Sequence, residues 1–464
     1  MPSTRREFLS QATLTAALAG LGPSLGSLLA AVQKSDRPYR DLAVRCGEWI
    51  DRSRQTTPAG FAWPADPLKP GSIGLDYYNG LPGVVAFYAN LWHATADERW
   101  RQCAQRGGER MNAEVRRAGD GFDSGLYTGL AGVAATYQVL AAANVGPQWS
   151  VLARQASREL TTRAKVLDEG VEWSASNDII SGTAGIGLLL LDAAARYQDD
   201  TAADFAAQAG RRLLKTGVPA EGGLMWFPGS TARGANYPNF SHGTSGVAYF
   251  LATLYQRTKD RAFLDGALAG AKYLDAIATR KPGARAIFHV TGGGENRFYL
   301  SWCHGPVGTA RLFYRLHQIS GDAAWSQWID ELTGWVIASG APEEQSAGYW
   351  NNISQCCGNV GIGQYCIDLA RHLPSVLTRT GTGSLRDRVV KNTLSRATDD
   401  ETGLRWIQAE NRVSPESLAA QTGFMQGAAG VGTFFLQLDA LSRGASWAAP
   451  WPDTPWIGRA GSAS

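Results

Sequence analysis

Residues 242–254 read HGTSGVAYFLATL, a G-x-x-G turn followed at once by apolar sequence with a helical period. The same arrangement occurs seven times along the chain, with the first glycines of successive turns 49 to 69 residues apart. These glycines are Gly80, Gly129, Gly182, Gly243, Gly305, Gly358 and Gly427. Glycine pairs arise readily by chance in a chain with 54 glycines. The signal is therefore the quasi-regular spacing together with the helical period after each turn.

A second set of helix-period segments lies between the glycine turns, for example FAAQAGRRLLKTG at 205–217 and FLDGALAGAKYLDAIA at 263–278. Each repeat therefore predicts two helices, one of which starts at a glycine that permits a tight turn. Seven such hairpins form either an open solenoid or a closed ring. We expect the closed ring, an all-α (α/α)7 toroid, because it gathers the reactive turn residues at one end. Strand signals are sparse, and IFHVTGG at 287–293 and GYWNNI at 348–353 are candidates for short strands in the connections.

The composition excludes several classes of function. A net charge of +3 over 464 residues is too balanced for a dominant role in nucleic-acid or membrane-surface binding. Six cysteines in a chain of this length do not make a disulfide framework. Beyond the N-terminal segment there is no run of 18 apolar residues, so we expect no membrane-spanning helix in the mature protein.

The N-terminus predicts an export signal. Arg5 and Arg6 precede Phe8 and Leu9, and a long apolar stretch almost free of charge follows. This pattern is typical of a twin-arginine signal, which a translocase reads as an address; the alternative is a disordered basic tail. We therefore expect a signal peptide over 1–31, with a poorly defined cleavage site, and one toroid domain over 32–464 in the periplasm or outside the cell.

The residues just before the glycines carry the reactive groups. His242, His304 and Cys357 each directly precede a first glycine, and Cys303 and Cys356 stand two positions before theirs. In a ring these side chains would converge at one rim. Three thiolates suit a tetrahedral Zn²⁺ ion with one position open for water or substrate. The alternatives are small buried core residues or a disulfide that includes Cys303. The other cysteines lie in predicted helices and are expected in the core: Cys46, Cys103 and Cys366.

The segments SWCHGPVG at 301–308 and SQCCGNVG at 354–361, with HGTSG and NDIISGTAG upstream, resemble the lanthionine synthetase C-like (LanC) family. Its members are zinc enzymes with an (α/α)7 toroid fold, and the resemblance covers essentially the mature chain. It implies that zinc activates a cysteine thiol of a peptide, which adds to dehydroalanine or dehydrobutyrine to form a thioether. The resulting enolate carbon must then be protonated by a positioned acid.

The resemblance also implies roles for individual residues. The family's zinc ligands fall on Cys303, Cys356 and Cys357, its acid–base histidine on His242, and its turn aspartate on Asp178. The alternative for His242 is a hydrogen-bonded core histidine or one that caps its turn, and the alternative for Asp178 is an N-cap or turn residue. His304 is either a second proton donor or an ordered turn residue.

Three positions depart from the usual family pattern. Cys357 stands where most members have histidine, which makes the ligand set one unit more negative. Tyr299 stands where members often have arginine, and the nearest arginine is Arg297, which is a weak candidate for stabilising an enolate. The residue after Cys303 is histidine, as in some members, whereas others have tyrosine there.

Two other functions stay open. A toroid that keeps zinc without cyclase activity would bind thiols or thiol-containing peptides. Helical toroids also include carbohydrate-active enzymes with paired carboxylates, for which Asp76 and Asp178 are candidates and the 16 tryptophans could line a groove. The carbohydrate interpretation does not explain why Cys303, Cys356 and Cys357 stand just before the glycine turns. The expected partners are a thiol-containing peptide, dehydrated or not, and the twin-arginine translocase, with no nucleic acid.

Overall fold

The computed structural model describes residues 35–229, 234–344, 352–410, 412–446 and 451–455. The expected signal peptide over 1–31 lies outside these ranges, as do residues 348–351 of the expected strand GYWNNI. Within the described ranges, no helix has both the length and the apolar character needed to span a bilayer. Contacts divide the chain into a first unit (Met1–Glu114, Val139–Gly146 and Trp350–Ala449) and a second unit (Val115–Gln138, Pro147–Tyr349 and Pro450–Ser464).

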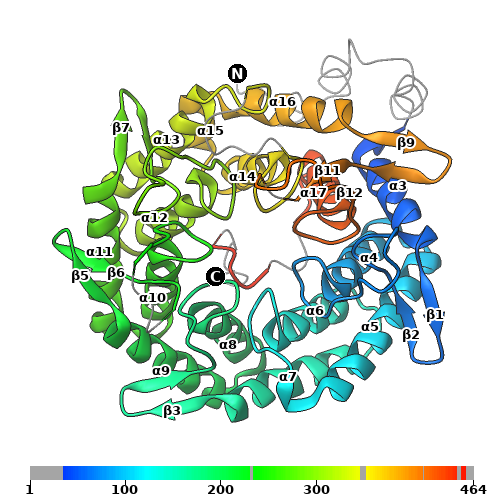
Figure 1. The fold of residues 1–464 in the computed structure, drawn as a ribbon, viewed down its shortest axis with the longest axis horizontal. Helices are drawn as coiled ribbons and strands as arrows, with labels where there is room; N and C mark the ends of the chain where they lie inside the picture. The colour runs from blue at the N-terminus through cyan, green and yellow to red at the C-terminus, as the bar shows by residue number, and fades with distance from the viewer. Residues whose placement is uncertain (1–34, 230–233, 345–351, 411, 447–450, 456–464) are drawn as a thin grey trace. The chain divides into compact units, whose positions relative to one another are not determined.

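Helices dominate both units (Figure 1). The first unit contains α3 (Pro38–Arg52), α4 (Leu81–Thr95), most of α5 (Glu98–Ala118), α14 (Asn359–His372), α15 (Pro374–Thr380), α16 (Thr382–Ser395) and α17 (Ala428–Ser442). The second unit contains most of α6 (Leu130–Ala142), α7 (Gln148–Arg163), α8 (Thr183–Tyr197), α9 (Asp200–Thr216), α10 (Thr244–Thr258), α11 (Arg261–Ile277), α12 (Pro306–Ser320) and α13 (Ala323–Ala338). A single 3-10 turn, η2 (Gly119–Gly121), follows α5.

Seven helices begin directly after the first glycine of a G-x-x-G turn, as the repeat predicts: α4, α6, α8, α10, α12, α14 and α17. The second glycine of each turn has a packing role. A Cβ atom at Gly308 would lie 1.9 Å from the carbonyl oxygen of Trp302, and one at Gly430 would lie 1.9 Å from that of Phe424. The start of the helix therefore lies directly against the backbone of the preceding turn, an approach that only glycine permits.

The substitution Gly430→Ala is expected to lower the free energy of unfolding by about 2–4 kcal/mol, because the added Cβ forces the backbone apart. Urea denaturation followed by circular dichroism measures this loss. The control is Gly121→Ala, where an added Cβ meets nothing within 4 Å and the change should stay within about 0.5 kcal/mol. Equal effects of the two substitutions would contradict the packing role of Gly430.

The glycine-turn helices pack against partner helices within each unit. In the second unit α8 packs on α9, α10 on α11 and α12 on α13; in the first unit α14 packs on α16 and α17 on α3. Helix α8 is buried on nearly all sides, whereas α9 buries one face formed by Ala202, Ala206, Ala209, Gly210 and Leu213. A helix that is apolar all round belongs in an interior and an amphipathic helix at a surface. The glycine-turn helices are therefore inner and their partners outer.

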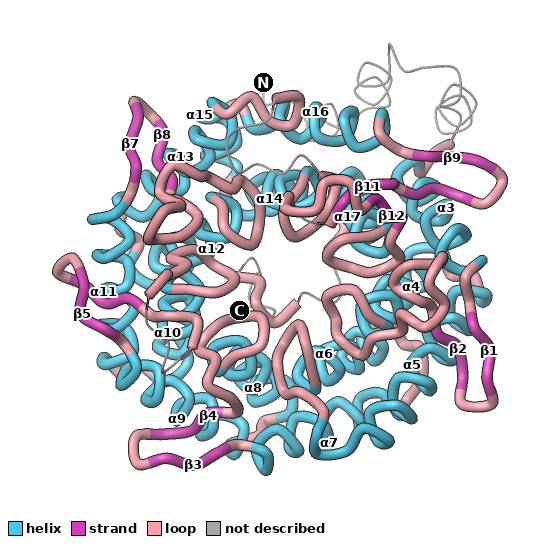
Figure 2. Tube along the Cα trace, in the orientation of Figure 1, coloured by secondary structure: helices cyan, strands magenta, loops and turns pink. Residues whose placement is uncertain are grey.

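The expectation of few strands is wrong, because the described residues contain six short antiparallel hairpins. They are β1–β2 (Gln55–Thr57, Gly60–Ala62), β3–β4 (Lys165–Leu167, Gly170–Glu172), β5–β6 (Val218–Ala220, Gly223–Met225), β7–β8 (Thr279–Lys281, Ala284–Ala286), β9–β10 (Thr398–Asp400, Gly403–Arg405) and β11–β12 (Ile407–Ala409, Leu418–Ala420). Each of the first five directly follows an outer helix (Figure 2). Strands of three residues are too short for an alternating pattern to reveal them. The expected strand at 287–293 is reduced to an isolated bridge between Val290 and Gly294.

Several tryptophans anchor the hairpins to the outer helices. Three indole N–H groups donate to helix carbonyls at 2.6–2.8 Å, in the pairs Trp173–Leu160, Trp226–Leu213 and Trp406–Thr393. Each bond ties the chain after a hairpin to the end of the helix before it. These tryptophans are packing residues and do not support a sugar-binding groove.

Candidate functional site

The residue two positions before a first glycine is held in place by main-chain hydrogen bonds between neighbouring turns. In the second unit the amide of Tyr127 donates to the carbonyl of Ile180 at 2.8 Å, and that of Ser241 donates to Cys303 at 2.9 Å. In the first unit the amide of Cys356 donates to Met425 at 3.1 Å. We call this series of bonds the turn ladder. It fixes the backbone at this register without using the side chains.

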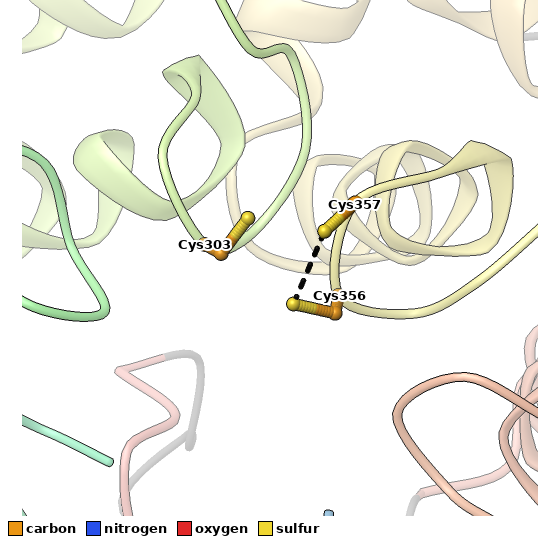
Figure 3. Close-up of side chains that lie close together, drawn as sticks. All are labelled: Cys303, Cys356 and Cys357. Atoms are coloured by element: carbon orange, nitrogen blue, oxygen red, sulfur yellow. Dashed lines mark hydrogen bonds between the residues drawn. The ribbon is translucent and has the colours of Figure 1, made fainter. Parts of the chain in front are cut away.

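The three cysteines expected to bind metal lie together (Figure 3). The Sγ atoms of Cys303, Cys356 and Cys357 are all within 4.8 Å of one another, and those of Cys356 and Cys357 are 3.4 Å apart. Cys303 and Cys356 are each 3 % exposed, whereas Cys357 is partly exposed. No disulfide joins any of the six cysteines, all of which lie in the described ranges, so the disulfide alternative gains no support.

The donor set suits zinc. A tetrahedral Zn²⁺ ion with sulfur bonds of about 2.3 Å holds its sulfur ligands about 3.8 Å apart, and the three Sγ atoms need only small shifts to reach that spacing. Cys357 is the one partly exposed member of the cluster. The cluster could therefore hold a metal ion with three thiolates and one open position. Cys46, Cys103 and Cys366 are buried outside this cluster, and burial raises the pKa of Cys366 to about 12.

His242 and Asp178 form a direct pair in the second unit. His242 Nδ1 lies 2.6 Å from Asp178 Oδ2, the histidine side chain is 37 % exposed and that of the aspartate 3 %. Because a carboxylate accepts hydrogen bonds, it fixes the proton on Nδ1 and directs Nε2 away from itself. Asp178 Oδ1 also accepts from the amide of Ser181 at 2.8 Å. Asp178 therefore both caps its turn and orients the histidine, while Asp76 accepts from the amides of its own turn, at Asn79 and Gly80.

His304 lies beside this pair in an enclosed position. Its ring centroid is 5.6 Å from that of His242, 4.6 Å from that of His289 and 5.4 Å from that of Tyr237. Burial, followed by the charges of His242 and His289, holds the pKa of His304 well below its usual range. Its Nδ1 has no hydrogen-bond partner among the described residues. At neutral pH His304 is therefore a neutral imidazole that can donate one N–H.

Two residues packed around His304, His289 and Tyr237, are not suggested by the sequence. Neither stands one or two positions before the first glycine of a turn. His289 belongs to the loop between β8 and α12, and its amide donates to the carbonyl of Arg297 at 2.8 Å. Its ring lies 4.5 Å from that of Tyr299, centroid to centroid. Tyr299 thus packs on an imidazole, and the backbone of Arg297 helps to place that imidazole.

The arrangement of turns, thiols and the histidine–aspartate pair defines a class of protein. The family model described as "Lanthionine synthetase C-like protein" matches residues 71–453. The chain therefore belongs to the lanthionine synthetase C-like family, as the segments around Cys303 and Cys356 indicate.

Solved structures give the fold. Nisin cyclase matches with a TM-score of 0.60 and 15 % sequence identity, covering 86 % of this chain and 93 % of the cyclase. The fold of this chain is thus the α/α toroid expected from the seven turns. The Lin0763 protein from Listeria innocua (TM-score 0.47, 11 % identity, 87 % and 96 % coverage) and an alpha-1,6-mannanase from Salegentibacter sp. HEL1_6 (0.45, 12 %, 87 % and 99 %) also match, too weakly to support an argument about function. No curated protein sequence matches the chain.

Proposed function

We propose that this protein is a zinc-dependent cyclase that adds a peptide cysteine thiol to dehydroalanine or dehydrobutyrine and so forms a thioether. The observation that carries the proposal is the cluster of three Sγ atoms within 4.8 Å of one another. The pairing of His242 with Asp178 at 2.6 Å supplies the acid–base group that the reaction also needs.

The residues of the chain have separate tasks in this reaction. Cys303, Cys356 and Cys357 would hold Zn²⁺, which when bound lowers the pKa of a substrate thiol so that it reacts as thiolate. When the sulfur bonds to the β-carbon of the dehydroamino acid, the electron pair of the double bond moves toward the neighbouring carbonyl. His242 Nε2 delivers a proton to the α-carbon. The proton released by the substrate thiol replaces the one that His242 has given up. No oxidant or reductant is needed.

Asp178 and His304 assist this proton transfer. The carboxylate of Asp178 accepts a hydrogen bond from His242 Nδ1 and so holds the ring in one orientation. His304, which is neutral, can donate a hydrogen bond to the developing enolate oxygen. We further propose that the segment 1–31 directs export by the twin-arginine pathway and that residues 32–464 act as one domain in the periplasm or outside the cell.

The second candidate function is a zinc-binding protein without cyclase activity, which the same thiol cluster would also support. The purified full chain distinguishes the two when it is analysed for metal and then incubated with a peptide that contains one cysteine and one dehydroalanine. A cyclase should bind about one zinc per chain. It should also convert the peptide thiol into a thioether, so that the peptide no longer reacts with an alkylating reagent, which mass spectrometry detects. Zinc binding without thiol protection would favour the second candidate, and the absence of bound zinc would overturn both.

A further inference from the structure

The described C-terminal segment, residues 451–455, places the carboxylate of Asp453 in the interior of the second unit, where this residue is 1 % exposed. Its Oδ1 lies 2.8 Å from Arg311 Nη1, and its Oδ2 accepts from the Tyr127 hydroxyl at 2.9 Å and from Trp302 Nε1 at 3.3 Å. Arg311 Nη1 also donates to the main-chain carbonyl of Asp453 at 3.0 Å. Donors from two distant parts of the sequence, Tyr127 and the segment from Trp302 to Arg311, thus converge on one residue.

All members of this cluster are enclosed. Tyr127 is 3 % exposed, Trp302 1 % and Arg311 6 %, and the ring of Trp451 packs near Tyr127 with centroids 5.9 Å apart. A buried ion pair is costly to open, because the partner left behind is a charge without compensation. Segment 451–455 is therefore a fixed part of the interior of this unit and not a tail that a ligand could readily displace.

Arg311 shows that this contact is specific to one repeat. It stands six residues after the first glycine of its turn, on the inner helix α12, which is buried from Pro306 to Leu316. At the same register the other inner helices carry uncharged residues: Ala86, Ala135, Leu188, Tyr249, Gln364 and Thr433. The one charged side chain at this position is the one that pairs with Asp453.

The cluster is linked directly to the turn that carries Cys303. Trp302 precedes Cys303 in the chain, and its ring lies 5.0 Å from that of Tyr127 and 5.8 Å from that of Phe240. The carbonyl of Cys303 accepts the turn-ladder bond from Ser241 at 2.9 Å. The backbone around Cys303 is therefore held by the turn ladder through the Cys303 carbonyl. It is also held by the neighbouring Trp302, whose indole N–H donates to Asp453.

We propose that Asp453 is a positioning residue for the thiol of Cys303, acting through the indole of Trp302 and the charge of Arg311. Groups beyond the ligands often set how a metal ligand is oriented. Without the carboxylate, Arg311 keeps a buried charge and the Trp302 N–H loses its acceptor, so the turn relaxes and Cys303 becomes accessible. The consequence for metal affinity rests on the proposed function, whereas the consequence for thiol accessibility does not.

The test measures the alkylation rate of each cysteine in the native, metal-free full chain, by iodoacetamide labelling and peptide mass spectrometry. Asp453→Asn should raise the rate of Cys303 at least tenfold relative to that of Cys366. Cys366 is fully buried, and burial raises its pKa to about 12, so its labelling reports general unfolding. Asp453→Glu keeps the charge and should restore much of the protection.

Two further variants serve as controls. Asp439→Asn removes another buried carboxylate, which is 3 % exposed at its side chain and accepts from Arg37 at 2.7 and 3.1 Å in the first unit. It should leave the ratio of the Cys303 rate to the Cys366 rate unchanged. Trp302→Phe removes the indole N–H while keeping a ring, and should raise the ratio even if Asp453→Asn does not fold.

Zinc titration of the same variants separates this inference from the proposed function. Asp453→Asn should weaken zinc binding about 10- to 100-fold. If the wild-type chain binds zinc but the labelling ratio does not change in Asp453→Asn or Trp302→Phe, the inference is wrong and the proposed function stands. If the wild-type chain binds no zinc, the proposed function fails, and the labelling ratio alone still decides whether Asp453 positions Cys303.

Discussion

Replacing Cys303 with alanine is expected to abolish zinc binding, from about one ion per chain to less than a tenth after gel filtration. Cys303 contributes one of the three Sγ atoms that lie within 4.8 Å of one another. Two adjacent thiolates, those of Cys356 and Cys357, cannot by themselves complete a tetrahedral site. Because the turn ladder holds this register through main-chain atoms, the variant should remain folded while it loses its metal. Elemental analysis and circular dichroism measure the two properties.

Two matched variants sharpen this prediction. Cys366→Ala removes a thiol that is buried away from the cluster, so it should keep zinc at some cost in stability. Cys357→His replaces a thiolate with the ligand that relatives usually have and should also keep zinc, whereas Cys357→Ala should not. Full zinc occupancy in Cys303→Ala, or equal loss in Cys366→Ala, would show that the three thiols are not the metal site.

The second large effect is expected for His242→Ala, which should reduce thioether formation by about 10² to 10⁴ without changing the zinc content. The side chain that is lost is the one whose Nδ1 lies 2.6 Å from Asp178 and whose Nε2 is directed away from that carboxylate. Asp178→Asn should reduce the rate less, because the amide oxygen of asparagine can still accept from His242 Nδ1 and orient the imidazole. Single-turnover assays with a dehydroalanine peptide measure both effects.

A control for this series is His317→Gln, on the last turn of α12. His317 Nδ1 lies 3.1 Å from the main-chain carbonyl oxygen of Asp322, and the residue is partly exposed. This variant should react at the wild-type rate. If His242→Ala reacts as fast as His317→Gln, another group must protonate the product, and the proposed role of His242 is wrong.

The sequence predicts the inner helices well because their signal is local. Each begins at a glycine turn, and the close contacts at Gly308 and Gly430 explain why glycine is needed there. The grouping of Cys303, Cys356 and Cys357 is also predictable, because a repeat converts positions far apart in the chain into one structural register. The hairpins are missed because strands of three residues carry no period that a sequence pattern can reveal.

The rest of the site depends on contacts that have no local signature. His289 reaches His304 from a loop outside the glycine register. Asp453 meets Trp302 across 151 residues and Tyr127 across 326. No periodicity links such positions, and a single chain without aligned relatives gives no indication that they pair. Long-range contacts between side chains of unrelated segments are therefore visible only in three dimensions.

The turn ladder has a consequence for how such a protein can change during evolution. Its bonds join main-chain atoms of Ser241 and Cys303, and of Cys356 and Met425. Serine, cysteine and methionine therefore all occupy the same position, two residues before the first glycine of a turn. The main-chain atoms of these residues stabilise the turns, and their side chains determine which chemical groups stand there. A single substitution at this position can therefore add or remove a cysteine side chain, while the main-chain bonds of the turn ladder are kept.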